Sequence, residues 1–539
     1  MRKYMFIFKE HSKELLFLAI ITVASSVLNI LVTYIGGKYI DIVVKANTFN
    51  LIYAICSFFL ILSLGNLFLT YLISYIIEPL IEKIVFDIKK HVLRHLKKIS
   101  LLDYNKFNVS YLAKRIDEDS RQIAGFFVNN YITLFIKIIE VIIILVVVFK
   151  INAIVALLML LLSPVYFVLY KKFKNPIFKK NLLMKEKTAE FFQDYTYQLE
   201  YMEDIVIDAN FKREENLLNN KYLDYQDRIK EFVTVNCNLS LAQGVILAIM
   251  QIVIFLFGGI SVIRGTTSVG GLSILMTYFM QILKNISYYI GLSKNYQIMK
   301  SSIYRLDEIL NIPVQKEGKK KLDDIYSISA KVSCMISKKV IFKDINVEAQ
   351  KGNIIGIVGS NGTGKTTLMK ILVGALKLDR ENKQENNAII YNDTYRVEDL
   401  DSIYLREKCL VYIPQRIRFR DVTIEEIFVE SGIKNSKELF IYMYENEIEM
   451  PDKIKNFFES KWKEKVNNLS GGDKQFVTIV LSVIKNGILY IMDEPTANLD
   501  SDRIEWFCKL LFKIKSNKIV FLITHDEKIT TIFDKTICL

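Results

Sequence analysis

Six long runs of apolar residues occupy the first three hundred residues of this 539-residue chain. Hydrophobic residues make up 51% of the whole chain, and the mean hydropathy of +0.24 is too high for an ordinary soluble enzyme. A helix needs about 20 apolar residues to cross the hydrocarbon region of a bilayer. We therefore predict six transmembrane helices, at about residues 14–44, 50–80, 126–149, 152–171, 240–263 and 269–295.

Lys and Arg residues gather at the N-terminus and in two of the connections between these runs. The opposite side of the predicted bundle carries little more than Lys45, Lys150 and Arg264. By the positive-inside rule, both termini and both long connections are cytoplasmic. The net charge of +13 is then explained by anchoring at the membrane surface, and nucleic acid is not an expected partner. We expect a multi-pass protein of the cell (cytoplasmic) membrane, in contact with the lipid bilayer, and the richness in Lys, Ile and Asn is typical of an AT-rich bacterium.

The two basic connections are about 45 and about 70 residues long, whereas the connections on the opposite side have only a few residues. Ile84, Ile88 and Val92 keep a helical spacing within the first of them. We therefore expect the transmembrane helices to continue into the cytoplasm and to turn back there.

The second half of the chain has a different pattern, beginning at about Asp324 after a charged linker at 313–323. Short apolar runs alternate with helical segments, which predicts the buried strands of a mostly parallel sheet. The clearest strands are Asn353–Val358, Cys409–Ile413, Ile488–Met492 and Ile519–Thr524. Because open α/β sheets bind ligands at the carboxyl ends of their strands, the polar residues that follow are the candidates for a site. They are Gly359, Gln415, Asp493 and His525.

Residues 359–366 form a complete G-x-x-x-x-G-K-[ST] phosphate loop. Its glycines, Gly359, Gly362 and Gly364, let consecutive backbone N–H groups curl around phosphate oxygens, and the following helix points its positive end the same way. We expect Lys365 to reach the β- and γ-phosphates and Thr366 to ligate Mg²⁺. The other predicted ATP-binding residues are Ser360, Asn361, Thr363, Thr367 and Gln415.

The order of the motifs is more specific than the phosphate loop alone. The loop is followed by Leu469-Ser470-Gly471-Gly472, then by Asp493-Glu494, and later by a lone His525. In this order the motifs resemble those of one family, the ATP-binding cassette (ABC) transporters, and the long helical connections resemble the exporter class. The resemblance implies an all-α six-helix transmembrane domain at 1–312 with long cytoplasmic extensions. An α/β P-loop ATPase domain with a small helical subdomain would follow at 324–539.

Phosphoryl transfer depends mostly on positioning and charge, and it gives each polar residue at the strand ends a role. Asp493, Thr366 and Gln415 would hold Mg²⁺. Glu494 is placed to orient or deprotonate the attacking water, and His525 to contact the γ-phosphate. The predicted enzyme is an ATP hydrolase coupled to transmembrane transport.

Ser470, Gly471 and Gly472 precede a helical run and form a second anion site at a helix N-terminus. In the family this signature closes over the γ-phosphate held by the other subunit, beside the D-loop, where Asp500 falls here. One chain has a single ATPase half and therefore implies a dimer. A homodimer is favoured because no half-site has visibly lost a catalytic group, and a heterodimer with a second half-transporter stays the alternative.

Two positions depart from the family pattern. Ile336 stands where exporters usually carry a Tyr that stacks on adenine, and Asp473 stands where the signature usually has Gln. In exporters, short coupling helices at the turning points rest on the ATPase, and the resemblance places them here near residues 102–119 and 199–210.

The predicted function is ATP-driven export by alternating access, with a peptide or bacteriocin, a drug or a lipid as cargo. The alternatives are an importer with the exporter fold, one half of a heterodimeric transporter, and an ATP-gated regulatory protein. Ionisable residues inside the membrane are costly and usually face a cavity or each other. The predicted cargo path is therefore lined by Lys284 with Tyr288 one turn away, and by Lys137 and Glu140, which could instead neutralise each other.

Overall fold

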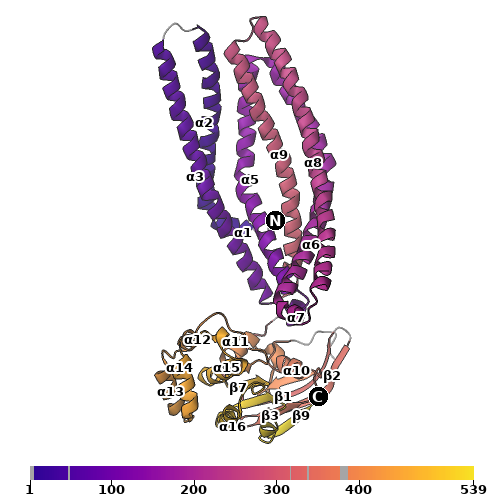
Figure 1. The fold of residues 1–539 in the computed structure, drawn as a ribbon, viewed down its shortest axis with the longest axis vertical. Coiled ribbons are helices and arrows are strands. Elements are labelled where there is room, and N and C mark those ends of the chain that lie inside the picture. Colours follow the sequence, from indigo (N-terminus) through magenta and orange to yellow (C-terminus); the bar gives the residue numbers. More distant parts are fainter. Residues whose placement is uncertain (1–4, 46–48, 316, 337–338, 377–386) are drawn as a thin grey trace. The chain divides into compact units, whose positions relative to one another are not determined.

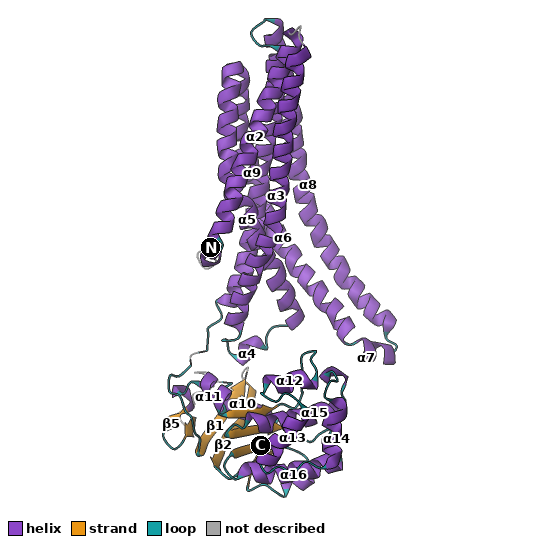
Figure 2. Cartoon of the chain, turned by 90° about the vertical axis from the view of Figure 1, so that its left-hand side faces the viewer, coloured by secondary structure: helices purple, strands orange, loops and turns teal. Residues whose placement is uncertain are grey.

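The computed structural model describes residues 5–45, 49–315, 317–336, 339–376 and 387–539 (Figure 1). Residue 316 of the predicted linker lies outside the described residues. The chain divides into two compact units: Met1–Ile99 with Asp103–Val314, and Ser100–Leu102 with Gln315–Leu539. In both views helices make up the first unit, whereas strands and helices are layered in the second (Figure 2).

The helices before residue 311 include six long ones, and the described parts of the six predicted apolar runs fall on them. They are α1 (Met5–Glu10), α2 (Ser12–Lys45), α3 (Phe49–Leu96), α4 (Leu101–Tyr104), α5 (Val109–Ile151), α6 (Ala153–Glu200), α7 (Met202–Ile207), α8 (Phe211–Ile263) and α9 (Val269–Leu310). Among the described residues, α2, α3, α5 and α8 contain helices long and apolar enough to cross a membrane. The chain is thus a multi-pass membrane protein.

Several of these helices are much longer than a bilayer is thick. Helices α3 and α6 have 48 residues each and α8 has 53. At 1.5 Å per residue, 48 residues extend about 72 Å, against about 30 Å of hydrocarbon. The short helices α4 and α7 lie where the chain turns back, near the two regions predicted from the sequence. No residue of α7 is buried.

The extensions pack around their own apolar core. Ile84, Ile88 and Val92, chosen from the sequence for their helical spacing, are all fully buried there. A buried ion network ties α5, α6 and α9 together nearby: the carboxylate of Asp119 accepts from Nζ of Lys185 at 2.9 Å and lies 3.0 Å from Nε of Arg305. Buried charges are tolerated when they are paired in this way.

The second unit contains two sheets. A five-stranded parallel sheet has the order β6-β7-β8-β3-β9, and an antiparallel sheet has the order β2-β1-β4-β5. The strands are β1 (Ser327–Ile336), β2 (Lys339–Gln350), β3 (Ile354–Val358), β4 (Ala388–Tyr391), β5 (Tyr395–Arg396), β6 (Leu410–Ile413), β7 (Leu489–Asp493), β8 (Ile519–Ile523) and β9 (Lys535–Cys538). The four strands predicted from apolar runs are found within one residue of their expected bounds. Every residue of β7 and β8 is buried, as continuous apolar runs require.

The helices of this unit cover the sheets and form a small helical group. They are α10 (Lys365–Leu372), α11 (Ser402–Lys408), α12 (Ile424–Glu430), α13 (Ser436–Glu445), α14 (Asp452–Lys461), α15 (Gly471–Lys485), α16 (Ser501–Lys515) and α17 (Glu527–Thr530), with 3-10 turns η3 (Val397–Asp399) and η4 (Val466–Asn468). Aromatic side chains pack in the core between α12, α14 and α15: Phe428 meets Phe458 edge to face, and Phe458 packs against Phe476 at a tilt of 39°. The predicted fold class, a helical membrane region followed by an α/β nucleotide-binding unit, is confirmed.

Candidate functional site

The strand order of the parallel sheet brings the predicted site residues together. Strands β6, β7, β8 and β3 are consecutive neighbours and run parallel, so their carboxyl ends lie in a row at one edge. Gln415 follows β6 and His525 follows β8. Asp493 is the last residue of β7, and Glu494 comes directly after it. The phosphate loop follows β3. Residues more than 150 positions apart in sequence therefore meet at one site.

The phosphate loop joins β3 to α10 through backbone that suits glycine. Gly362 and Gly364 have φ values of 86° and 98°, in the left-handed region that other residues avoid. A Cβ on Gly364 would also lie 2.5 Å from the side chain of Ile341. The ammonium of Lys365 donates to the carbonyl oxygens of Gly359 at 2.7 Å and Ser360 at 3.1 Å, so it is held against the loop. The loop, the cation and the start of α10 therefore have the arrangement that suits an anion.

Two oxygen ligands suited to Mg²⁺ lie beside the loop. The hydroxyl of Thr366 donates to Oδ2 of Asp493 at 2.6 Å, and hydroxyl and carboxylate oxygens are what this ion prefers. Asp493 is 2% exposed, and burial raises its pKa above the ordinary value. The neighbouring Glu494 raises the pKa further, against the lowering effect of the Thr366 hydrogen bond and of nearby lysines. A bound cation would remove this penalty, so the two residues fit the metal.

Glu494 is contacted at the front of the site by residues at the ends of two neighbouring strands, β6 and β8. Its backbone N–H donates to the carbonyl of Ile523 in β8 at 2.9 Å. Its Oε2 accepts from Nε2 of Gln415 at 2.9 Å, and its Oε1 lies 4.0 Å from Nε2 of His525. Gln415, predicted as a metal ligand, thus contacts Glu494 here. The carboxylate is partly exposed.

The signature residues open α15. Ser470 caps this helix by accepting from the N–H of Asp473 at 3.1 Å. Gly472 packs so close to the loop after β7 that a Cβ would collide with the carbonyl oxygen of Asn498. Asp500, further along the same loop, caps α16 by accepting from the N–H of Arg503. The signature and the D-loop are therefore packed against each other within one chain.

Asp473, which departs from the family pattern, has partners of its own. Its carboxylate lies 2.8 Å from Arg503 and 3.4 Å from Lys461. Burial raises the pKa of Asp473, but hydrogen bonds from Arg503 and from Ser470 outweigh burial and hold this pKa below its ordinary value. The extra negative charge in the signature is thus neutralised by α16 and α14.

Two residues of this site were not predicted from the sequence. Gln475, 2% exposed on α15, donates from Nε2 to the carbonyl oxygen of Glu494 at 2.6 Å, and it accepts from Nδ2 of Asn498 at 3.2 Å. The available signal was an amide at position 475 on the apolar face that also carries Phe476 and Ile479. A polar side chain on a buried face must find partners.

The remaining predicted residues lie elsewhere. Ile336 ends β1 and packs, partly buried, against the core of the second unit. In the first unit, Nζ of Lys137 donates to Glu140 at 2.7 Å, so this pair neutralises itself as the alternative proposed. Tyr288 donates to the backbone of Asn130 at 3.3 Å, and Lys284 is exposed.

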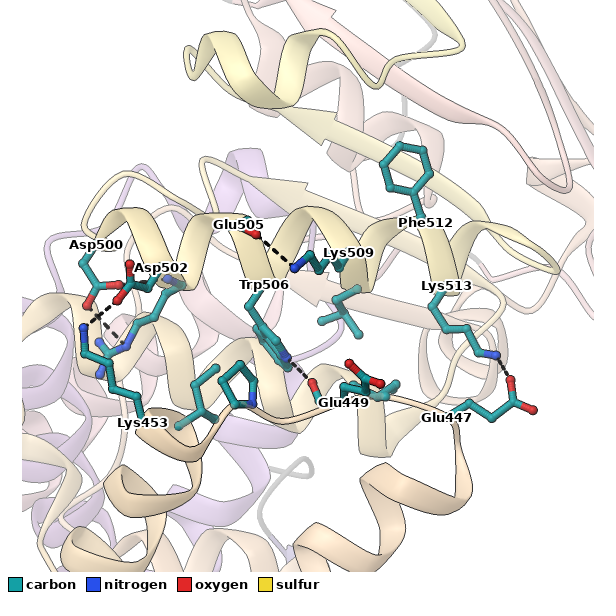
Figure 3. Close-up of a pocket in the computed structure, with 15 residues that line it drawn as sticks. Glu447, Glu449, Lys453, Asp500, Asp502, Glu505, Trp506, Lys509, Phe512 and Lys513 are labelled. Atoms are coloured by element: carbon teal, nitrogen blue, oxygen red, sulfur yellow. Dashed lines mark hydrogen bonds and ion pairs between the residues drawn. The ribbon is translucent and has the colours of Figure 1, made fainter.

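A separate cavity of about 670 Å³ lies between α16 and the segment joining α13 to α14. Figure 3 shows two ion pairs across this cavity, Lys453 with Asp502 and Lys513 with Glu447, and a third pair along α16, Lys509 with Glu505. Trp506 donates to the carbonyl of Glu449 at 2.8 Å. Of the predicted site residues this cavity includes only Asp500, so the nucleotide site is not here.

Two family models match the chain. The model described as the ABC transporter transmembrane region covers residues 15–286, which is just over half of the chain, and the model described as ABC transporter covers residues 342–497.

Individual relatives agree with these matches. The multidrug resistance-like ATP-binding protein MdlB of Buchnera aphidicola is 23% identical over 98% of this chain and 90% of its own length. A probable ABC transporter ATP-binding/permease protein of Haemophilus influenzae is 29% identical over 38% of this chain, and the match spans 36% of that protein. The fold is similar to the solved structure of a bacterial Atm1-family ABC exporter with ATP bound, with a TM-score of 0.81 and 16% identity over 98% of this chain and 93% of that one.

Proposed function

Because this chain belongs to the ABC transporters, with a transmembrane region and an ATP-binding region in one polypeptide, we propose that it exports a substrate across the cell membrane by hydrolysing ATP. The observation that carries this proposal is the row of Gln415, Glu494, Asp493 and His525 beside the phosphate loop, in a chain that also crosses the membrane. The relatives are named a multidrug resistance-like protein and an exporter, which favours the outward direction.

The residues of the site then divide the work of hydrolysis. The glycine loop and Lys365 bind the phosphates of ATP, while Thr366 and Asp493 would hold Mg²⁺, whose charge neutralises that developing on the phosphates. Glu494 orients the attacking water and accepts its proton, and Gln415 fixes the direction of that carboxylate. His525, whose side chain is 59% exposed, contacts the γ-phosphate. Positioning of this kind supplies most of the catalysis in phosphoryl transfer.

We propose that the working unit is a dimer. The signature turn, Ser470 to Gly472, would close over the ATP bound to a second subunit. It stands at the N-terminus of α15, and helix N-termini bind anions. A homodimer is favoured, since Glu494, Ser470 and His525 are all present. Helix α7, at the tip of the α6–α8 hairpin, also favours a dimer. Its exposed apolar residues, among them Met202, Val206 and Ile207, could be covered by a second subunit. We place this tip on the ATPase unit of the second subunit.

We further propose that α6 and α9 also cross the membrane, giving six spans, with both termini in the cytoplasm. Of the two cations predicted to line the cargo path, Lys284 is exposed and has no ion pair among the described residues, so it favours an anionic or amphipathic cargo. Peptides, drugs and lipids all include such molecules.

Transport by inside-out vesicles tests the proposal. Candidate cargoes are first screened for stimulation of the ATPase of the purified protein in nanodiscs, with Lys365→Ala as the inactive control. Export predicts that ATP drives a stimulating cargo into inside-out vesicles. Movement in the opposite direction would identify an importer. ATP hydrolysis that no cargo stimulates, with no vectorial movement, would favour an ATP-gated regulatory protein. Activity that requires a second, different half-transporter would replace the homodimer by a heterodimer.

A further inference from the structure

Glu494 adopts a backbone conformation that a glutamate does not choose by itself. Its φ is 50°, in the left-handed region, immediately after β7 ends at Asp493. Residues with a Cβ are disfavoured in this region unless the surroundings hold them there. The direction in which the carboxylate leaves the sheet depends on this φ. Whatever holds the backbone of Glu494 therefore also aims its side chain.

Three hydrogen bonds involve the peptide groups of Glu494, and the longest of them is donated by the N–H of Ala497 to the carbonyl oxygen of Glu494 at 3.4 Å. The two shorter ones come from other elements. On one side its N–H donates to the carbonyl of Ile523 in β8 at 2.9 Å. On the other its carbonyl oxygen accepts from Nε2 of Gln475 at 2.6 Å. The first bond belongs to the sheet, as expected at a strand end. The second comes from a side chain on another element, α15, and is the one that substitution can remove.

Gln475 is itself held on both sides. Its side chain is buried, and its Oε1 accepts from Nδ2 of Asn498 at 3.2 Å, which orients the amide so that Nε2 faces Glu494. Asn498 in turn is pressed against Gly472. The amide thus spans the loop that leaves β7, from its first residue to its fifth. A buried amide with both ends satisfied has one orientation.

We propose that Gln475 is a positioning residue for hydrolysis, which holds Glu494 of its own chain in the left-handed conformation that aims its carboxylate. This inference rests on the proposed role of Glu494. Gln475 acts through the carbonyl of Glu494, so it affects turnover more than nucleotide binding. Displacing a reacting group by about 1 Å can reduce a rate about 100-fold.

The first test separates turnover from binding and from folding. Gln475→Ala removes both hydrogen bonds, and Gln475→Glu replaces the donor with an oxygen that repels the carbonyl of Glu494. We expect kcat for ATP to fall by about 10- to 100-fold, with KM changed less than about 2-fold. Ser482→Ala is the matched control, because Ser482 is another buried polar residue of α15 and its hydroxyl donates to the carbonyl of Ile479 in the same helix. The same loss of kcat in the control, or a wild-type kcat in both Gln475 variants, would overturn the proposal.

Mixed dimers give a readout that a general loss of structure would not produce. Glu494→Gln is combined with Gln475→Ala either in the same subunit or in opposite subunits. If Gln475 serves Glu494 of its own chain, the same-subunit pairing leaves the other catalytic site intact and keeps roughly half of the activity. The opposite-subunit pairing damages both sites and loses most of it.

The reverse pattern would show that Gln475 serves the signature turn, and equal activities would show that it serves no particular site. Either result rejects the proposal. The wild-type dimer in the same assay keeps this outcome distinct from failure of the proposed function, because a wild-type protein without ATPase activity would refute the role of Glu494 itself.

Discussion

Two buried aspartates, one in each unit, have opposite surroundings. Asp119, fully buried among α5, α6 and α9, lies within 3.0 Å of two cationic side chains, Lys185 and Arg305. Asp493, 2% exposed at the end of β7, has a hydrogen bond from Thr366 but no cation within ion-pairing distance among the described residues. The first carboxylate is compensated by its own protein and serves the fold. The second has no such counter-charge among the described residues, and this difference separates a candidate site from a structural ion pair.

Removing the charge of Asp119 should have the largest effect on stability. Asp119→Asn leaves Lys185 and Arg305 buried without a counter-charge, and breaking a buried pair in this way costs about 3–5 kcal/mol. We expect a large drop in the thermal unfolding temperature of the purified protein. Asp117→Asn is the control two positions away, because Asp117 is paired with Lys89 at the surface, where an ion pair is worth at most about 1 kcal/mol. Equal drops in unfolding temperature for the two variants would contradict the structural role given to the buried Asp119 network.

Removing the charge of Asp493 should instead affect activity. Asp493→Asn should lower the Mg²⁺-dependent ATPase rate at least about 100-fold, since even outer-shell partners of a metal contribute 10- to 100-fold. The pKa of Asp493 is raised in the folded protein, so ionisation of this carboxyl destabilises the folded state. The free energy of unfolding therefore decreases as pH rises above the unfolded pKa of about 3.9. At neutral pH and without nucleotide, the variant should therefore unfold at a slightly higher temperature than the wild type. A variant that is both inactive and much less stable would show that Asp493, like Asp119, serves the fold.

Removing the charge of Asp473 should destabilise the protein less than removing the charge of Asp119. Its pKa is lowered in the folded protein, so its contribution to stability is present above the unfolded value of about 3.9 and is lost as pH falls through the folded value. Asp473→Asn should cost about 1 kcal/mol at neutral pH, because burial offsets part of the hydrogen bonds from Arg503 and Ser470. Unfolding curves at pH 7 and at pH 3 measure this, and the difference between variant and wild type should shrink at the lower pH. A difference that grows as the pH falls would be inconsistent with the lowered pKa.

The same contrast explains what the sequence could predict. The phosphate loop and the strand ends were accessible, because Gly359–Thr366 is a contiguous motif and each strand is a short apolar run ending in a polar residue. Asp119, Lys185 and Arg305 were not recognised as a group, since they lie on three helices up to 186 positions apart and no local pattern links them. Gln475 was missed for a similar reason. Its partner is a main-chain carbonyl, that of Glu494, and the sequence does not indicate which main-chain groups a side chain contacts. The neutralisation of Asp473 depended on Arg503, 30 positions away.

ATP binding and hydrolysis by Glu494→Gln, measured side by side on the purified dimer with Mg²⁺, test most directly that this chain is an ATP-driven transporter with Glu494 as its catalytic carboxylate. The substitution keeps the shape of the side chain and removes the proton acceptor. We predict that the variant binds ATP as tightly as the wild type, accumulates as a closed dimer with nucleotide trapped, and hydrolyses ATP at a background rate. Hydrolysis at a near wild-type rate would contradict the assignment of Glu494.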